Sequence, residues 1–356
     1  MLLKSQNSDH ERLLVAMSGG VDSSVAACLL REEGYDLVGA TMRLCPVDDK
    51  TALEDAAKAA ERLSMEFHIC DYKEEFRREV IDPFISAYEH GETPNPCIEC
   101  NRHLKFGRLL EFGETLGIRR AATGHYARIE QDVNRFLLRK AADFTKDQSY
   151  VLYTLTQEQL SRTLFPLGGL TKEEARRLAE AYGLANAKRK ESQDICFIPD
   201  GDYAGFIKRE SGLTYPPGDF VDTEGNILGT HRGVIHYTVG QRKGLGLALK
   251  QPMYVKEIDT VGNRIVLAIH EELFRTELTA RDVNWIAIEP PHGDLRVKAR
   301  IRYKHQEAPA TVIPLGENRI AIRFDEPQRA VTPGQSVVLY EDDYVVGGGV
   351  IEHSDR

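Results

Sequence analysis

A short string rich in glycine and serine at residues 16–24 constrains the fold of this chain more than any other stretch. An apolar run at residues 12–16 leads into it, and residues 25–30 follow it with a helical composition. This order predicts a strand, a tight turn and a helix start, because adjacent glycines allow positive φ angles and leave backbone N–H groups uncovered. The first N–H groups of that helix and its positive dipole end would point at the same place. The stretch therefore predicts a site for an anionic group, such as the pyrophosphate of a nucleotide.

The same string could instead be an ordinary turn between a strand and a helix, capped by a serine or by Asp22. It matches neither the dinucleotide pattern G-x-G-x-x-G nor the pattern G-x-x-x-x-G-K-[ST]. The string S-G-G-V-D-S resembles the signature of the PP-loop ATP pyrophosphatases, which cleave ATP between the α and β phosphates and adenylate a substrate. The resemblance implies that ATP is bound by Ala16, Met17, Ser18, Gly19, Gly20, Val21, Asp22 and Ser23.

Residues 12–130 alternate between predicted strands and predicted helices. Strands are expected at 12–17, 36–42, 66–70 and 119–123, and helices at 22–33, 51–64, 73–89 and 102–116. Asp22 is expected to cap the first helix, and Gly34 to follow its end. Such alternation implies a parallel sheet covered on both faces, with ligands at the carboxyl ends of its strands. Met42, Gly124 and His125 are therefore expected along the same edge as the glycine loop.

The pattern of apolar runs and turns changes at two points in the rest of the chain. From about residue 205, short apolar runs alternate with turns, and from about residue 280 short strands follow one another at 281–288, 296–303, 309–314, 319–324 and 335–341. The last group predicts a small antiparallel barrel. The predicted fold class is α/β, with an N-terminal parallel-sheet PP-loop domain at 1–204, a small central mostly-β domain at 205–279 and a C-terminal antiparallel β-barrel at 280–356.

Two stretches of the N-terminal domain carry local signals. Lys146, Asp147 and Gln148 stand at the head of an apolar run at residues 149–155, which is expected to be helical. Thr171 and Glu174 have the spacing of a capping box, so a helix is expected to open there and to end before Gly183.

Charge and apolar patterning bear on partners and location. The formal net charge of −9 argues mildly against nucleic acid, although phosphate binding needs only a local basic surface. Basic clusters, each of which could also be a solvated face, are Arg102 with His103, Lys105 and Arg108; Lys188 with Arg189 and Lys190; and residues 296–304. No apolar run approaches ~18 residues, and the N-terminus lacks the features of a secretory signal. We expect no membrane span and a cytoplasmic protein.

Six cysteines are too few for a disulfide scaffold and fit a reducing compartment. Cys28 and Cys70 lie in apolar runs and are expected in the core. Cys97 and Cys100 lie in the stretch Thr-Pro-Asn-Pro-Cys-Ile-Glu-Cys-Asn at residues 93–101, where two prolines predict a stiff loop without helix. A helix expected to open after Cys100, with basic residues nearby, would stabilise a thiolate there. The alternative, half of a four-cysteine zinc site, lacks a second C-x-x-C.

Several motifs together resemble the tRNA-specific 2-thiouridylase (MnmA/TrmU) family, and the resemblance covers essentially the whole chain. They are the glycine loop, residues 93–101, Ala-Thr-Gly-His-Tyr-Ala at 122–127, Lys-Asp-Gln-Ser-Tyr at 146–150, Cys-Phe-Ile at 196–198, Tyr-Thr-Val-Gly-Gln-Arg-Lys-Gly-Leu at 237–245 and the tail from Pro333. The resemblance implies a tRNA-uridine 2-sulfurtransferase. In such an enzyme, ATP adenylates the C2 oxygen of wobble uridine 34 in the tRNAs for Lys, Glu and Gln, and persulfide sulfur then replaces the adenylate.

The resemblance also implies roles for single residues. Cys196 would carry the persulfide, and Cys100 would be the partner nucleophile that resolves it by forming a disulfide. ATP would enter with Mg²⁺ and would also contact Met42 and Gly124. The target base would contact Asn95, Pro96 and Cys97, and the remaining tRNA contacts would be His125, Lys146, Asp147, Gln148, Arg302, Tyr303 and Gln335. A cysteine desulfurase, directly or through a relay protein, would supply the sulfur.

Cys97 departs from the family pattern, because many members have aspartate at this position. Two interpretations stay open: a persulfide relay with Cys97 as a spare or structural thiol, or a 4Fe-4S cluster held by Cys97, Cys100 and Cys196 with one iron open for sulfide. Two rival functions are a PP-loop ligase that adenylates a small molecule and a non-catalytic RNA-binding protein with a relic nucleotide fold. The first needs no pair of distant cysteines, and the intact glycine loop argues against the second.

Overall fold

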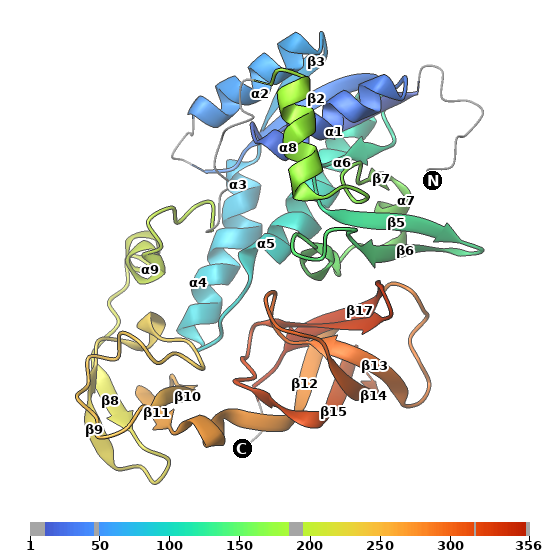
Figure 1. Ribbon diagram of the computed structural model, residues 1–356. Helices are drawn as coiled ribbons and strands as arrows, with labels where there is room; N and C mark the ends of the chain where they lie inside the picture. The colour runs from blue at the N-terminus through green and yellow to red at the C-terminus, as the bar shows by residue number, and fades with distance from the viewer. Residues whose placement is uncertain (1–10, 46–49, 185–194, 317, 354–356) are drawn as a thin grey trace. The chain divides into compact units, whose positions relative to one another are not determined.

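The computed structural model describes residues 11–45, 50–184, 195–316 and 318–353, and Figure 1 traces the chain. The predicted basic cluster of Lys188, Arg189 and Lys190 lies outside the described residues. The chain forms two compact units. The first comprises Met1–Glu79, Cys97–Gln193 and Asp342–Val345, and the second comprises Val80–Pro96, Asp194–Glu341 and Val346–Arg356. No helix in the described ranges is long and apolar enough to cross a membrane.

The first unit is built on a five-stranded parallel sheet with the strand order β3-β2-β1-β4-β7. Its strands are β1 (Arg12–Ala16), β2 (Asp36–Arg43), β3 (Glu66–Asp71), β4 (Ala121–Ala122) and β7 (Thr163–Leu164). In the register of β1, Ala16 lies opposite Ala40 of β2, and Val15 lies opposite Ala122 of β4. The predicted parallel sheet is confirmed, and the carboxyl ends of β1, β2 and β4 meet at one edge.

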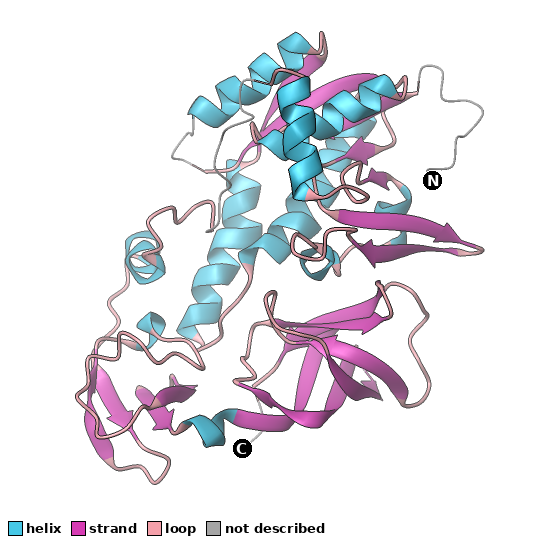
Figure 2. Cartoon of the chain, in the orientation of Figure 1, coloured by secondary structure: helices cyan, strands magenta, loops and turns pink. Residues whose placement is uncertain are grey.

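Helices cover both faces of this sheet, as Figure 2 shows by its colours. Leu13 and Val15 of β1 pack in one apolar cluster with Ala27 of helix α1 (Val21–Glu32) and Ala56 of helix α2 (Lys50–Arg62). Leu14 points to the opposite face, where a Cβ on Gly113 of helix α6 (Leu109–Thr115) would lie 3.5 Å from its Cδ2. The alternation follows from the period of two along a strand, so burial on both faces requires the continuous apolar run seen here.

The start of α1 differs from the prediction. Its N-cap is Gly20 rather than Asp22, and the end of α1 is followed by Gly34 with a φ of +94°, as expected. Asp22 stands in the first turn instead, and its carboxylate accepts hydrogen bonds from Lys172 and Tyr126. The prediction that Asp22 caps the helix was wrong, because stronger charge-assisted partners outside the helix hold its side chain.

The cysteine stretch also differs from the predicted loop. A helix begins at Pro96 as α5 (Pro96–Glu99) and continues through the π-helical segment η2 (Cys100–Arg108) into α6. Proline is tolerated at the first helical position, where its missing N–H has no partner to lose. Asn101 secures this segment, since its Nδ2 donates to the carbonyl of Val151 at 2.9 Å. Cys97 and Cys100 therefore lie inside the helix rather than before it.

The remaining elements of the first unit are short. They are α3 (Lys73–Phe76), the π-helical turn η1 (Arg77–Ile81, which runs into the second unit), the hairpin β5 (Ala127–Asp132) and β6 (Arg135–Lys140), the 3₁₀ turn η3 (Ser149–Leu152), α7 (Gln157–Ser161) and α8 (Lys172–Ala181). The capping box at Thr171 and Glu174 is confirmed, and Gly183 follows α8 with a φ of +62°. The run after Gln148 forms only one 3₁₀ turn, which is shorter than the helix expected there.

The second unit contains two helices and two β structures. The helices are α4 (Asp82–Glu89) and α9 (Tyr203–Ser211), and the smaller sheet has the order β10-β11-β8-β9, formed by Tyr254–Asp259, Arg264–Ala268, Gly218–Val221 and Ile227–His231. The 3₁₀ turns are η4 (Val234–His236) and η5 (His270–Leu273). A cluster around Phe220, Tyr237 and Ile265 forms the apolar core of the smaller sheet.

The C-terminal barrel is confirmed, with one strand that the sequence pattern does not predict. Its strands are β12 (Phe274–Trp285), β13 (Leu295–Arg300), β14 (Ala308–Gly316), β15 (Arg319–Arg329), β16 (Ser336–Glu341) and β17 (Tyr344–Ile351). The order β12-β15-β14-β13-β16-β17 closes because β17 also pairs with β12. Glycines are depleted in strands, which hides β17 in the sequence. The strand needs them here, because a Cβ on Gly347 would lie 2.5 Å from the carbonyl oxygen of Asn284.

Replacing Gly19 by alanine is expected to destabilise the protein more than replacing Gly34. Both glycines have positive φ, which costs an L-residue about 1–2 kcal/mol. A Cβ on Gly19 would in addition lie 2.2 Å from the carbonyl oxygen of Ala52, whereas nothing lies within 4 Å of one on Gly34. Overpacking adds about 1–3 kcal/mol, so Gly19→Ala should lower the free energy of unfolding clearly further than Gly34→Ala. Urea denaturation measures both, and equal losses would contradict the packing of the loop described here.

Candidate functional site

The loop after β1 is closed by the hydroxyl groups of the first turn of α1. Ser23 Oγ accepts a hydrogen bond from the Ser18 N–H at 3.2 Å and donates to the Gly20 carbonyl at 3.1 Å. Ser24 Oγ donates to the same carbonyl at 3.2 Å. The N-cap of α1 is Gly20, which has no side chain to cap the helix, and the Gly20 N–H donates to Ser18 Oγ at 3.3 Å. The loop thus presents the N-terminal turn of a twelve-residue helix, the arrangement that suits an anion.

Two glycines allow this loop to pack closely against neighbouring segments. Gly19, with a φ of +72°, passes close to Ala52 of α2. Gly124 follows β4 and lies against α1, where a Cβ would be 2.7 Å from the Ser23 nitrogen. The chain's own packing therefore requires a glycine at position 124, and the expected close approach of a ligand stays a prediction. Met42 is half-buried in β2, two residues beyond Ala40, which pairs with Ala16.

An ion pair between the buried Lys172 and the half-buried Asp22 lies beside the loop, and the sequence reasoning missed it. Lys172 Nζ donates to both carboxylate oxygens of Asp22 at 2.7 Å, and the Tyr126 hydroxyl donates to Oδ1 at 2.9 Å. The Lys172 ammonium also lies 5.4 Å from the centroid of the Tyr126 ring. The only sequence signal for Lys172 was its place next to Thr171 in the capping box, which points to a helix start and not to a site.

His125 is buried among aromatic rings. Its Nδ1 lies 2.7 Å from Thr123 Oγ1, and its ring lies 5.7 Å from that of Phe106 and 5.9 Å from that of Phe165. Burial, with a smaller contribution from the Lys105 charge, holds the pKa of His125 well below its usual range. The imidazole thus packs in the core of the first unit, and the tRNA contact that the resemblance implies for His125 stays a prediction.

The side chains of Asp147 and Gln148 make hydrogen bonds to other residues of the chain. Asp147 is buried, and its carboxylate accepts hydrogen bonds from the Ala141 N–H at 3.1 Å and the Ser149 hydroxyl at 2.8 Å. Gln148 Oε1 accepts from the Tyr126 N–H at 2.8 Å. Lys146 is half-buried at the turn that these bonds fix. Of the three predicted tRNA contacts in this stretch, two side chains therefore stabilise the loop next to Tyr126.

Cys97 and Cys100 lie three residues apart in the continuous helical segment and differ strongly in accessibility. Cys97 is exposed, whereas Cys100 is 8% exposed and its neighbour Leu104 is fully buried. The predicted basic surroundings are partly neutralised, because His103 lies 3.3 Å from Glu99 and Arg108 lies 2.7 Å from Glu111. In the part of the chain that the structure describes, no group of three or more His, Cys, Asp or Glu is arranged to hold a metal ion.

Cys196 belongs to the second unit and is exposed. The next residue, Phe197, anchors the turn, since its ring lies 5.5 Å from that of Phe84 in α4 and 5.1 Å from that of Phe206 in α9. A thiol beside such an anchor is displayed at a defined place while its own side chain faces solvent. The motif Cys-Phe-Ile therefore combines an exposed thiol with two residues that anchor the turn, since Ile198 is also buried.

Of three more predicted contacts in the second unit, Gln335 and Arg302 join separate segments, and Tyr303 has a partner three residues away. Gln335 Nε2 donates to the Thr93 carbonyl at 2.6 Å, next to the stretch that contains Asn95 and Pro96. The Arg302 guanidinium donates to the carbonyls of Val239 and Ala330, both at 3.0 Å. The ring of Tyr303 lies 5.7 Å from the Arg300 guanidinium. Each of these side chains has a structural partner, so its tRNA contact stays a prediction.

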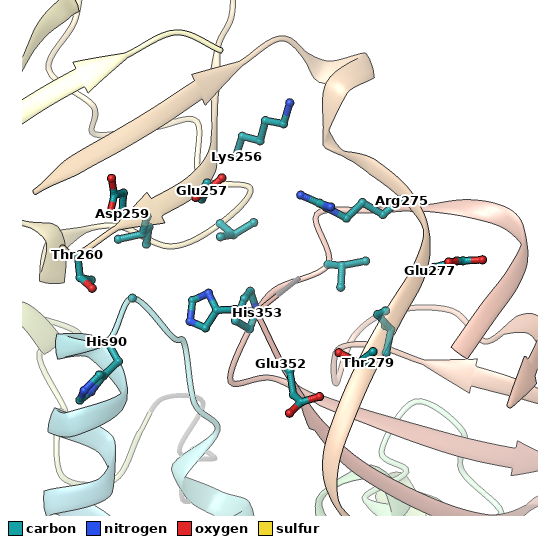
Figure 3. A pocket seen from close by; sticks show the side chains of 16 residues that line it. His90, Lys256, Glu257, Asp259, Thr260, Arg275, Glu277, Thr279, Glu352 and His353 are labelled. Carbon is teal, nitrogen blue, oxygen red and sulfur yellow. The ribbon is translucent and has the colours of Figure 1, made fainter. Parts of the chain in front are cut away.

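A cavity of about 420 Å³ in the second unit is lined by charged side chains of both signs, as Figure 3 shows. None of the predicted site residues of the described chain is among the sixteen that line it. Two of its carboxylates are already paired outside the cavity: Glu277 lies 2.7 Å from Arg323, and Glu352 lies 2.8 Å from Arg319. The lining residues include no residue of the glycine loop and no cysteine.

The sheet and its loop define a class of nucleotide-binding α/β protein, in which the ligand lies at the carboxyl ends of parallel strands. Three family models match consecutive parts of the chain. A tRNA methyl transferase HUP domain matches residues 11–200, a tRNA methyl transferase PRC-barrel domain matches residues 204–269, and an aminomethyltransferase beta-barrel domain matches residues 275–351.

Relatives extend the match to almost the full length. The tRNA-specific 2-thiouridylase of Clostridioides difficile is 48% identical over 97% of this chain and 99% of its own length. Those of Acetivibrio thermocellus and Caldanaerobacter subterraneus are both 49% identical, over 96% and 98% of this chain and 99% of their own lengths. The chain belongs to the tRNA-specific 2-thiouridylase family.

Burial of His125 predicts that acid destabilises the protein. A native pKa below that of the unfolded chain means that the unfolded chain takes up a proton first as the pH falls. The neutral His125 therefore stabilises the folded chain fully at pH values above the usual histidine pKa. As the pH falls below that pKa, the free energy of unfolding decreases by up to about 1.4 kcal/mol per pH unit. Urea titrations between pH 7.5 and 5 should show a smaller pH dependence for His125→Gln. The partly exposed His103→Gln serves as the control, and equal slopes for His125→Gln and the unmodified protein would contradict the assignment.

Proposed function

We propose that this chain is an ATP-dependent tRNA-uridine 2-sulfurtransferase. The observation that carries the proposal is the 48% identity to a tRNA-specific 2-thiouridylase across nearly the full length of both chains. Two features of the structure support it: the N-terminal turn of α1, whose N-cap is a glycine, and the exposed thiol of Cys196. The domain division proposed with it is 1–204 for catalysis, 205–279 for the central domain and 280–356 for the barrel.

The loop after β1 would bind ATP, which enters as its magnesium complex. A carbonyl oxygen is a poor leaving group, so sulfur cannot displace it directly from C2 of uridine. Attack of the C2 oxygen on the α-phosphate releases pyrophosphate and leaves AMP bonded to that oxygen. Backbone N–H groups at the helix start and the hydroxyl of Ser18 are the donors that would hold the phosphates.

The cysteines would then deliver sulfur in two steps. The terminal sulfur of a persulfide on Cys196 attacks C2, and AMP leaves with the original oxygen. Cys100 next attacks the Sγ of Cys196, which forms a disulfide and leaves the sulfur on the base. A thiol reductant restores both cysteines, and a cysteine desulfurase or a relay protein renews the persulfide. This relay uses Cys100 and Cys196 alone, so we propose it in place of an iron–sulfur cluster that would also need Cys97.

The tRNA would be uridine-34 tRNA for Lys, Glu and Gln, with the target base near Asn95, Pro96 and Cys97. Lys146, Arg302, Tyr303 and Gln335 are the remaining contacts proposed for the tRNA. Their hydrogen bonds within the chain make them suited to shaping the RNA-binding loops, because RNA is recognised largely by shape and backbone. An enzyme that consumes ATP and tRNA is expected in the cytoplasm.

Mass spectrometry of nucleosides tests the proposal. Unmodified tRNA for Glu is incubated with the full chain, ATP, Mg²⁺, a cysteine desulfurase and cysteine, then digested and analysed. We expect 2-thiouridine at position 34 only when ATP and the sulfur source are both present. Absence of 2-thiouridine from a folded, ATP-binding preparation would refute the assignment, and 4-thiouridine would point to a different target atom.

Serine variants of the cysteines separate the relay from the cluster. Cys100→Ser and Cys196→Ser should each lose thiolation by at least about a thousandfold, because a hydroxyl carries no transferable sulfur. Both should keep tRNA-dependent exchange of pyrophosphate into ATP. Cys97→Ser should retain thiolation within about threefold, and an active, anaerobically purified protein should contain no iron. Loss of activity in Cys97→Ser together with stoichiometric iron would instead support a cluster.

A further inference from the structure

Asp22 poses an electrostatic problem for the proposed nucleotide site. It lies in the first turn of α1, the turn that would receive the phosphates. A carboxylate in that turn is attracted to the N-terminal N–H groups of its own helix, so it competes with an anionic ligand for the same donors. It would also repel the phosphates directly, because both groups are negative.

Lys172 pairs with the Asp22 carboxylate, so that this carboxylate does not compete for the N–H groups of α1. Both oxygens of Asp22 accept hydrogen bonds from the Lys172 ammonium at 2.7 Å, and one also accepts from the Tyr126 hydroxyl at 2.9 Å. These three bonds come from outside α1, and the N-cap of that helix, Gly20, has no side chain to compete for its N–H groups. The carboxylate is therefore held by partners on α8 and on the segment after β4, and its charge is matched by an adjacent ammonium.

Lys172 is fixed in place by its own element. Its side chain is 10% exposed, against 30% for Asp22. Its backbone N–H donates to Asp143 Oδ2 at 3.1 Å, and the capping box of Thr171 and Glu174 defines the start of α8 at this residue. An ammonium on so well fixed a backbone loses little further freedom when a ligand binds, so it can set the position of Asp22 in advance.

We propose that Lys172 is a positioning residue of the nucleotide site, which draws the Asp22 carboxylate away from the first turn of α1 and so leaves that turn to the phosphates of ATP. The inference rests on the proposed ATP-dependent function. Without the ammonium, Asp22 turns toward the N–H groups of its own helix and its charge opposes the ligand. The position of Lys172 thus affects ATP affinity through Asp22 and not through the chemistry at the base.

A double-mutant cycle tests this chain of effects. ATP binding to the full chain is measured by calorimetry without tRNA and with EDTA present, so that no metal contributes. Lys172→Met should weaken ATP binding about tenfold, while Lys172→Arg, which keeps a bidentate cation, should stay within about threefold of the unmodified protein. Lys58→Met is the matched control, because Lys58 pairs with Glu54 at 4.0 Å on the surface and should leave the affinity unchanged.

The second arm of the cycle removes the carboxylate. Adding Asp22→Asn to Lys172→Met should restore the affinity, and in the Asp22→Asn background the change Lys172→Met should have no effect on ATP binding. The double variant can be compared with the unmodified protein even where either single variant fails to fold, because removing both charges leaves neither partner of the ion pair uncompensated. Unchanged affinity in Lys172→Met, or a loss that Asp22→Asn does not restore, would overturn the inference. An unmodified protein that binds ATP and obeys the cycle but makes no 2-thiouridine would refute the proposed function alone.

Discussion

The parallel pairing of β1 with both β2 and β4 is the constraint on which the rest of the first unit depends. Because β1 lies between these two strands, their carboxyl ends bring Met42 and Gly124 to the edge where the glycine loop begins. The loop cannot move away from that edge, since Gly19 is packed against α2 and Ser23 ties Ser18 to Gly20. The direction of α1, and with it the position of its N-terminal N–H groups, follows from this arrangement.

Many of the polar residues that the resemblance assigns to the substrate support other segments of the chain. Asp147 and Gln148 fix the turn beside Tyr126, and Tyr126 in turn contacts Asp22. Gln335 holds the segment at Thr93, and Arg302 joins segments at Val239 and Ala330. A residue that a family motif associates with a substrate can therefore act by shaping the loop that meets the substrate. Lys172 at the start of α8 acts in the same way at the proposed nucleotide site, because its charge positions Asp22.

The sequence predicted the fold where local chemistry and tertiary contacts agree. The apolar run at residues 12–16, the glycines after it and the capping box at Thr171 each determine their structure within a few residues, and each prediction was confirmed. The helix start at Pro96 was missed because proline breaks a helix interior but suits its first position. Strand β17 was missed because its glycines serve contacts with β12 that only the closed barrel creates. Lys172 was missed for the same reason, since its partner Asp22 lies 150 residues away in the sequence.

In the proposed mechanism, ATP activates the C2 oxygen of uridine before sulfur is transferred. The fate of that oxygen shows directly whether the base is adenylated. A tRNA labelled with ¹⁸O at C2 of uridine 34 is thiolated, and the released AMP and pyrophosphate are analysed by mass spectrometry. Adenylation of the C2 oxygen predicts that one ¹⁸O atom appears in the phosphate of AMP for each 2-thiouridine formed. Label in pyrophosphate, or its release into water with unlabelled AMP, would contradict adenylation of the base.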